Sequence, residues 1–270
     1  MNILFIEQAK KCGLIKKLFR EVELRNKKII INKNVSKINL KKKMKIVGKM
    51  QNKLDKNNCK KVVLSKSLKS NTEFLNLIYT KNIEVVDGRR LFKMFILEIV
   101  ELIEKEFNME KRESQIAILS NDYNRFVAKV IKELAPQCKF LNIVTHNIQK
   151  FENLEESLKE DGIIINITNN RKKSLLKSQI ILNLDFPEEV INRYSILDKA
   201  IIVNFEEAIK IKKKRFSGMV INWYKLILKN DSKLWDLINK QNLSEYDFNE
   251  ILEYYYYMGQ LGFDEVRIAI

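Results

Sequence analysis

The sequence has little glycine and little proline. With 7 glycines and 2 prolines in 270 residues, it has no flexible linker rich in these residues, so we expect a chain that is folded nearly throughout. Histidine occurs once and cysteine three times. Zinc and iron–sulfur sites need several such ligands at short spacing, so the sequence predicts no metal site. An odd number of widely spaced cysteines is typical of reduced thiols in the cytoplasm. They are Cys12, Cys59 and Cys138.

Long uninterrupted hydrophobic runs are absent as well. The longest apolar region, 91–103, is interrupted by Lys93, Glu98 and Glu101, which is typical of an amphipathic helix and not of a membrane span. The first residues, 1–7, form too short an apolar run for a signal peptide and have no basic flank before it. We therefore expect a cytoplasmic protein with no membrane association.

Positive charge is in excess. Lysine and arginine together number 50 against 34 acidic residues, for a net charge of +16. One interpretation is a basic nucleic-acid-binding module, because clustered cations attract polyanions; the densest runs are 41–43 and 210–215. The other interpretation is the lysine, isoleucine and asparagine bias of an AT-rich genome, with lysines spread over solvated helix faces. The sequence leaves both interpretations open.

Short β-branched runs alternate with helix-length amphipathic segments between residues 114 and 205. Continuous apolar runs suit strands that are buried on both faces, and strand–helix alternation predicts right-handed crossovers. The fold class that this predicts is α/β, with a Rossmann-like doubly wound parallel sheet. We expect a basic helix over 206–214 after the last strand. The expected strands are 116–119, 140–144, 163–167, 180–184 and 200–203.

This order of segments resembles the NAD(P)-binding domain of two-domain Rossmann-type proteins such as shikimate dehydrogenase and glutamyl-tRNA reductase. The stretch 180–189 is similar to their fourth strand and the turn after it. The resemblance implies a lysine and an aspartate in the first domain that face the nicotinamide. Lys66 and Asp87 are the catalytic candidates on this basis, although only Asp87-Gly88 matches the family's motifs around these two positions.

The turn after the first strand departs from that family. A dinucleotide site needs glycines there so that the backbone can approach the pyrophosphate, yet no glycine occurs between Gly88 and Gly162. Asp122 also adds a negative charge, which disfavours ordinary dinucleotide binding. A retained cofactor site would use the hydrogen-bonding groups and the positive charge of this turn, which are supplied by Ser120, Asn121, Asn124 and Arg125.

The end of the second strand gives a further indication about the cofactor. NAD enzymes place an acidic residue there for the ribose hydroxyls, whereas this chain has Thr145 and His146, with Lys150 nearby. These residues fit a phosphorylated ribose better than a free diol, so NADP is the dinucleotide that the sequence favours. The other interpretation is a polar strand end that faces water.

A second anion-binding candidate lies at the start of the helix near residue 91. Gly88 permits a tight turn, Arg89 and Arg90 supply positive charge, and helix-start amides favour an anion. Asp87 can cap the same helix. In the other interpretation, Asp87 only caps, Gly88 only turns, and the arginines are exposed.

We expect three parts: an N-terminal α/β domain over 1–108, a Rossmann-like domain over 109–210, and a helical tail over 211–270 that packs back on them. Tyr254–Tyr257 surround one helix of the tail, which intramolecular packing or a homodimer interface would cover. The leading hypothesis is that a nucleotide or an anionic small molecule binds in the interdomain cleft. The alternatives are the nucleic-acid-binding module and a structural or partner-binding descendant of a dehydrogenase. The sequence does not decide whether the protein is an enzyme.

Overall fold

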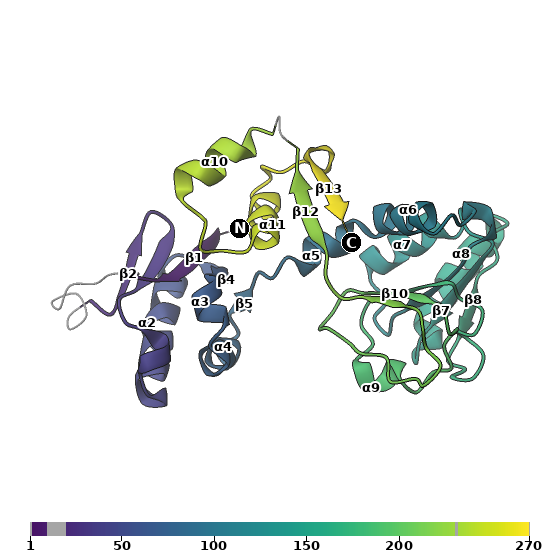
Figure 1. Ribbon diagram of the computed structural model, residues 1–270, viewed down its shortest axis with the longest axis horizontal. Coiled ribbons are helices and arrows are strands. Elements are labelled where there is room, and N and C mark those ends of the chain that lie inside the picture. The colour runs from purple at the N-terminus through teal and green to yellow at the C-terminus, as the bar shows by residue number, and fades with distance from the viewer. Residues whose placement is uncertain (1, 10–19, 230–231, 270) are drawn as a thin grey trace. The chain divides into compact units, whose positions relative to one another are not determined.

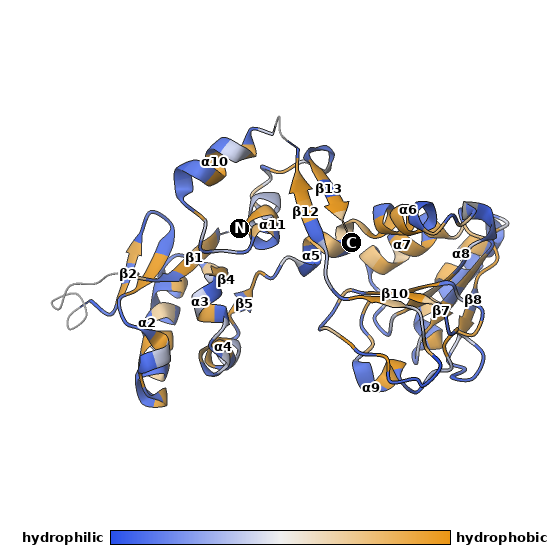
Figure 2. Ribbon diagram, viewed as in Figure 1, coloured by the Kyte–Doolittle hydropathy of each residue, from blue (hydrophilic) through white to orange (hydrophobic). Residues whose placement is uncertain are grey.

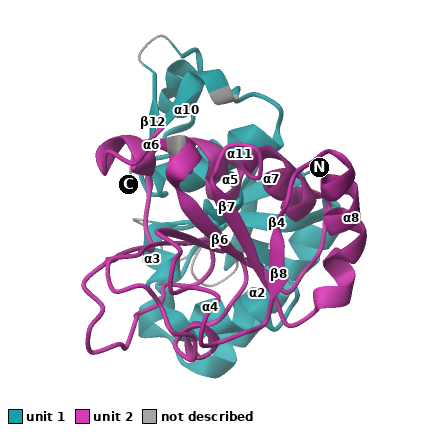
Figure 3. Cartoon of the chain, turned by 90° about the vertical axis from the view of Figure 1, so that its right-hand side faces the viewer, with its two compact units in different colours: residues 1–91, 226–267 teal, residues 92–225, 268–270 magenta. Residues whose placement is uncertain are grey.

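The computed structural model describes residues 2–9, 20–229 and 232–269. The chain divides into two compact units, which are coloured separately in Figure 3. Unit 1 comprises residues 1–91 and 226–267, and unit 2 comprises residues 92–225 and 268–270. Each unit therefore draws on two separate stretches of the chain. Cys12 lies outside the described residues.

Unit 1 contains a five-stranded sheet in the order β2-β3-β1-β4-β5. All of its strand pairs are parallel except β2 with β3, which is antiparallel. These two form a hairpin whose turn residues, Asn26 and Lys27, both have positive φ, as a two-residue turn of this kind requires. The elements of the first part of unit 1 are β1 (Asn2–Gln8), β2 (Val22–Arg25), β3 (Lys28–Ile31), α2 (Leu40–Lys56), β4 (Cys59–Leu64), α3 (Lys66–Lys69), α4 (Thr72–Tyr79) and β5 (Glu84–Val85).

The later part of unit 1 contains two helices, α10 (Leu234–Gln241) and α11 (Phe248–Tyr257). A two-stranded sheet is formed by β12 (Lys225–Leu228) and β13 (Val266–Ala269), whose residues 225, 268 and 269 are counted in unit 2. Helix α11 carries the run of tyrosines. The ring of Tyr254 lies 4.6 Å from that of Phe5 in β1, and Tyr255 is only 1% exposed. Packing within unit 1 thus covers the two tyrosines, and the homodimer stays a prediction.

Unit 2 is built on a six-stranded sheet in the order β11-β10-β9-β6-β7-β8, and all of its strand pairs are parallel. If these strands are numbered along the chain from β6, their order in the sheet is 6-5-4-1-2-3, which is the order of a Rossmann-type doubly wound sheet. The α/β, Rossmann-like fold class is thereby confirmed. The strands are β6 (Gln115–Leu119), β7 (Phe140–Val144), β8 (Asn166–Thr168), β9 (Ile180–Asn183), β10 (Ile201–Asn204) and β11 (Met219–Ile221).

The two faces of this sheet are covered differently. Figure 1 shows α6 (Ile96–Glu106) and α7 (Arg125–Leu134) on one side and the short α9 (Glu188–Ile191) on the other. Helix α8 (Glu152–Glu160) connects β7 to β8. The connections 169–179 and 205–218 contain no helix. Central strand residues such as Ile118 and Ile181 are nevertheless fully buried, and the orange strands of Figure 2 reflect their continuous apolar character.

Two expectations about local structure were wrong. The third strand is β8 and not 163–167, and Ile164 is 82% exposed. The segment 206–214 is not helical, because other side chains take its backbone hydrogen-bonding groups. The N–H of Lys210 donates to Glu188 at 2.9 Å, and that of Lys212 donates to Asn192 at 2.7 Å. Distant partners in and next to α9 therefore override the local helical pattern.

The apolar region 91–103 forms two helices, α5 (Arg89–Met94) and α6, which are separated at Phe95. In the described part of the chain, no helix is both long and apolar enough to cross a membrane. Residues 2–9, 20–229 and 232–269 also contain no group of three or more histidine, cysteine or carboxylate side chains placed to hold a metal ion.

Candidate functional site

The strand order of unit 2 creates a switch point between β6 and β9. These strands are neighbours at the centre of the sheet, and the chain winds outward from them in opposite directions. In open parallel sheets, ligands bind at the carboxyl ends of the strands on either side of such a point. Here the segments 120–124, 145–147 and 184–187 follow β6, β7 and β9 at that edge.

The turn after β6 surrounds a carboxylate of its own chain. The backbone N–H groups of Asn121 and Asp122 donate to the carboxylate of Asp185 at 2.8 and 3.0 Å. The hydroxyl of Ser120 donates to the same carboxylate at 3.0 Å. Three donors thus converge on one anion in the place where a Rossmann-type domain binds phosphate. The turn can hold an anion without glycine, and in this structure the anion is Asp185.

Asn121 connects this turn to the end of the second strand. Its side-chain oxygen accepts a hydrogen bond from the backbone N–H of His146 at 2.8 Å, and its backbone oxygen accepts one from the side chain of Asn147 at 3.0 Å. The His146 ring stacks on Phe186 with centroids 5.3 Å apart. Thr145 is buried, and its hydroxyl accepts from the N–H of Asn147. The three loops are therefore joined by hydrogen bonds.

The turn leads directly into α7. The side chain of Asn124 caps this helix by accepting hydrogen bonds from the backbone N–H groups of Phe126 and Val127. Arg125 is exposed at the first helical position. The positive end of the helix and the guanidinium group both favour an anion near the turn. The residues that the sequence predicted as one site thus lie at one edge of the sheet, on adjoining loops and at the start of α7. They are Ser120, Asn121, Asn124, Arg125, Thr145 and His146.

Buried asparagines fix the neighbouring strand ends. The amide nitrogen of Asn183 donates to the side-chain oxygen of Asn204 at 2.8 Å, and that of Asn204 donates to Asn222 at 3.1 Å. Asn183 and Asn204 are fully buried. Because buried amides need partners, this chain of hydrogen bonds specifies how β9, β10 and the segment after β11 line up.

The second predicted anion site, Gly88, Arg89 and Arg90, also receives carboxylates of its own chain. Asp87 accepts from the N–H of Arg89 at 3.0 Å, and Glu253 of α11 accepts from the N–H of Leu91 at 3.2 Å. Gly88 has a φ of 84°, which favours glycine. Burial raises the pKa of Glu253 to about 7. The amides of this short helix start are therefore occupied.

The two catalytic candidates lie in unit 1. The ammonium group of Lys66 is 3.8 Å from the carboxylate of Asp247. Asp87 lies 3.4 Å from the guanidinium group of Arg89 in addition to capping the helix. Both side chains thus have partners within the unit, and their catalytic role stays a prediction.

The two lysine runs are partly engaged within the chain. Lys43 in α2 is only 6% exposed and pairs with Glu73. Lys212 pairs with Glu188, and Lys213 donates to the backbone oxygen of Asn192. These lysines fasten elements to one another, and nucleic-acid binding by the runs stays a prediction.

The residue on which the switch-point turn converges, Asp185, was not among the site residues predicted from the sequence. Asp185 comes directly after the expected strand 180–184. The carboxyl ends of neighbouring parallel strands meet at one edge of the sheet. An acidic residue at the end of a strand therefore indicates that a carboxylate lies near the turns that follow the neighbouring strands. The buried asparagines at the ends of successive strands were a second signal of the same kind.

Comparisons with known proteins give no family. No family model matches the chain, and no curated protein matches it. Several solved structures are similar at low identity. L-Tryptophan dehydrogenase from Nostoc punctiforme is 10% identical with a TM-score of 0.36, over 97% of this chain and 76% of that one. Aspartate transcarbamoylase from Trypanosoma cruzi is 12% identical with a TM-score of 0.30, over 76% and 72%. Ornithine carbamoyltransferase from Pyrococcus furiosus is 6% identical with a TM-score of 0.32, over 82% and 75%. The likeness to these three structures is weak.

Proposed function

We propose that the protein binds a small anionic molecule at the switch point of unit 2 and that Asp185 occupies the site in the absence of this ligand. The observation that carries the proposal is the convergence of two backbone N–H groups and one hydroxyl on the carboxylate of Asp185. A set of hydrogen-bond donors that binds a carboxylate in this way can also bind the oxygens of a phosphate group. The ligand would take the place of Asp185 on the same donors.

NADP is the ligand that the surrounding residues fit best. Thr145 and His146 follow β7, where NAD enzymes have an acidic residue for the ribose hydroxyls, and neither carries a negative charge that would repel a ribose phosphate. Arg125 adds positive charge at the start of α7. Kinship with shikimate dehydrogenase and glutamyl-tRNA reductase is part of this proposal. The proposal concerns binding, and it assigns no catalytic step to the site.

Calorimetric titration of the full chain with NADP, NAD and inorganic phosphate tests the proposal. Asp185→Ala removes the internal competitor and leaves its donors vacant, so we expect this variant to bind NADP about tenfold tighter than the unaltered chain. Arg125→Gln in the same background should weaken NADP about threefold to tenfold. NAD should bind more weakly than NADP in every variant.

Asp161→Ala is the matched control. Asp161 is an exposed aspartate at the end of α8, away from the switch-point loops in the sequence, and its removal changes net charge by the same amount. It should leave NADP binding unchanged within about twofold. If Asp161→Ala strengthened binding as much as Asp185→Ala, the effect would be one of net charge. Absence of saturable binding of all three compounds to Asp185→Ala would overturn the proposal.

A further inference from the structure

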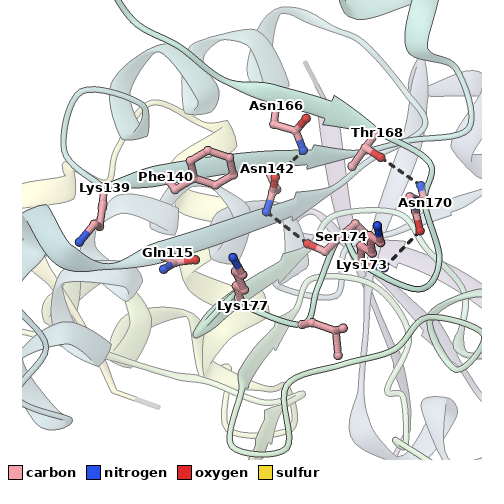
Figure 4. Close-up of a pocket in the computed structure, with 11 residues that line it drawn as sticks. Gln115, Lys139, Phe140, Asn142, Asn166, Thr168, Asn170, Lys173, Ser174 and Lys177 are labelled. Atoms are coloured by element: carbon pink, nitrogen blue, oxygen red, sulfur yellow. Dashed lines mark hydrogen bonds between the residues drawn. The ribbon is translucent and has the colours of Figure 1, made fainter.

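A hollow of about 580 Å³ lies on unit 2, and none of the residues that line it belongs to the switch-point loops 120–124, 145–147 and 184–187. Gln115 and Phe140 line it and are the first residues of β6 and β7. From these two residues the hollow extends along the sheet to Thr168 and Asn170 at the carboxyl end of β8. Figure 4 shows the lining side chains over the strands. The volume is in the range of small-molecule sites.

The hollow exists because no helix covers this part of the sheet. The connection 169–179 between β8 and β9 is irregular, whereas a Rossmann-type sheet ordinarily has a helix there. Apart from Phe140, the strand residues that line the hollow are polar, and they include Asn142 in β7 and Asn166 in β8. Asparagine is unusual in the interior of a parallel strand. Polar side chains therefore occur on the part of the sheet that no helix covers.

The rim of the hollow is held in place by specific hydrogen bonds, drawn as dashed lines in Figure 4. The N–H of Asn170 donates to the hydroxyl of Thr168 at 3.1 Å, and the side chain of Asn170 accepts from the N–H of Lys173 at 3.2 Å. The side chain of Asn142 donates to the backbone oxygen of Ser174 at 3.2 Å and accepts from Asn166 at 2.7 Å. An ordered rim lowers the entropy cost of binding.

Several polar groups at the hollow remain available. Lys173 and Lys177 line it and form no ion pair with any described residue, whereas Lys139 pairs with Glu113. Ser174 is only 5% exposed, and its hydroxyl has no hydrogen-bond partner among the residues that the structure describes. A buried hydroxyl without a partner is costly, so it indicates a missing hydrogen-bonding group. The ring of Phe140, which is 41% exposed, adds an apolar surface.

We propose that this hollow is a second binding site, which takes a ribose phosphate, either as a free sugar phosphate or as part of a nucleotide. Lys173 and Lys177 bind the phosphate through charge-assisted hydrogen bonds. The amide groups of Asn166 and Gln115 and the hydroxyl of Ser174 match sugar hydroxyls, which both donate and accept. The ring of Phe140 packs against the sugar or the base. This site goes beyond the proposed function and does not depend on it.

Calorimetric titration of the full chain with ribose 5-phosphate, AMP, ribose and inorganic phosphate tests the site. We expect ribose 5-phosphate to bind at least tenfold tighter than ribose or phosphate alone, because only it meets both the lysines and the amides. Tighter binding of AMP than of ribose 5-phosphate would identify a nucleotide as the ligand, and equal binding would identify a sugar phosphate. Phosphate binding as tight as that of ribose 5-phosphate would overturn the proposal.

Variants locate the site. The double change Lys173→Gln with Lys177→Gln should weaken ribose 5-phosphate about tenfold or more. Lys172→Gln is the matched control, since Lys172 is exposed on the same loop and does not line the hollow; it should leave binding within about twofold. Equal loss in Lys172→Gln and in the double variant would overturn the proposal.

Discussion

The backbone N–H of Asn121 lies 2.8 Å from the carboxylate of Asp185, which is 64 residues later in the chain. This contact joins the ends of the two central strands of unit 2 at the point where Rossmann-type sheets bind phosphate. The helix start at residues 88–91 shows the same relationship, because Glu253 accepts a hydrogen bond from the N–H of Leu91, 162 residues away. At both predicted anion-binding sites, a carboxylate of the chain itself accepts the hydrogen bonds of the backbone N–H groups.

Removing the carboxylate of Asp185 should destabilise unit 2. Asp185→Ala leaves the backbone N–H groups of Asn121 and Asp122 without this acceptor, whereas the Ser120 hydroxyl keeps the backbone oxygen of Asp122. We therefore expect the free energy of unfolding to fall by about 1–3 kcal/mol. Adding phosphate should restore part of this loss, because a ligand that binds only the folded state stabilises it. Urea unfolding followed by circular dichroism, with and without phosphate, measures both effects. A loss in Asp161→Ala as large as that in Asp185→Ala would contradict the interpretation.

Asn204 should be more sensitive to substitution than its small side chain suggests. Asn204→Ala removes the acceptor of the Asn183 amide and the donor to Asn222 in a fully buried position. We expect the free energy of unfolding to fall by about 2–4 kcal/mol, from the lost hydrogen bonds and the unsatisfied partners. Asn153→Ala, at an exposed position of α8, is the control and should change it by less than about 0.5 kcal/mol. Equal effects of the two substitutions in urea unfolding would refute the role of the buried asparagines.

The sheet of unit 2 could be predicted because its signal is local. Most of its strands are marked by apolar runs, and their alternation with helical segments predicts right-handed crossovers in a doubly wound sheet. The segment 206–214 could not be predicted in the same way. Its basic, partly apolar sequence indicates a helix, but Glu188, Asn192 and Asn222 bind its backbone. Such long-range hydrogen bonds leave no trace in the periodicity of the segment itself.

The candidate site shows the same division. The sequence places the residues of each switch-point loop at the end of its strand, because the loops follow recognisable runs. It does not show that Asp185 faces the amides of Asn121 and Asp122, since this depends on how β6 and β9 pair. The hollow over β7 and β8 was missed for a related reason. It depends on the absence of a helix in 169–179 and on polar residues within short strands, which a search for apolar runs passes over.

Tyr255 in α11 has a buried hydroxyl with no hydrogen-bond partner among the described residues. Tyr255→Phe removes that hydroxyl and keeps the ring, so we expect the free energy of unfolding to rise by about 1 kcal/mol. Tyr257→Phe is the contrasting variant, because the Tyr257 hydroxyl accepts a hydrogen bond from Arg90 at 3.1 Å; it should lower stability slightly. Thermal unfolding of both variants gives the comparison. Destabilisation by Tyr255→Phe would show that the hydroxyl has a partner in solution.

Unit 1 should become less stable as the pH rises from about 5 to 8. The pKa values of Glu250 and Glu253 are raised from an ordinary value of 4.5 to about 7, mainly by burial. The negative charge of Asp87 contributes to both shifts, and that of Asp247 contributes at Glu250. The ammonium group of Lys69 opposes the shift at Glu250. Between these two pKa values the folded state holds protons that the unfolded state has released. The contribution of these two groups to stability is complete below pH 4.5 and is lost as the pH rises through 7. The free energy of unfolding then falls by up to ~1.4 kcal/mol per pH unit for each group.

Substitution by glutamine, which cannot ionise, should remove this pH dependence. We expect urea unfolding of Glu250→Gln with Glu253→Gln, followed through the fluorescence of Trp235 in α10, to show a flatter profile between pH 5 and 8 than the unaltered chain. Glu160→Gln, at an exposed position at the end of α8, is the control and should keep the original slope. The slope is the diagnostic quantity, because Glu250→Gln also removes the ion pair with Lys69 and so shifts stability at every pH. Parallel profiles for the double variant and the control would mean that these two carboxyl groups titrate normally, and that the buried side of α11 is open to water.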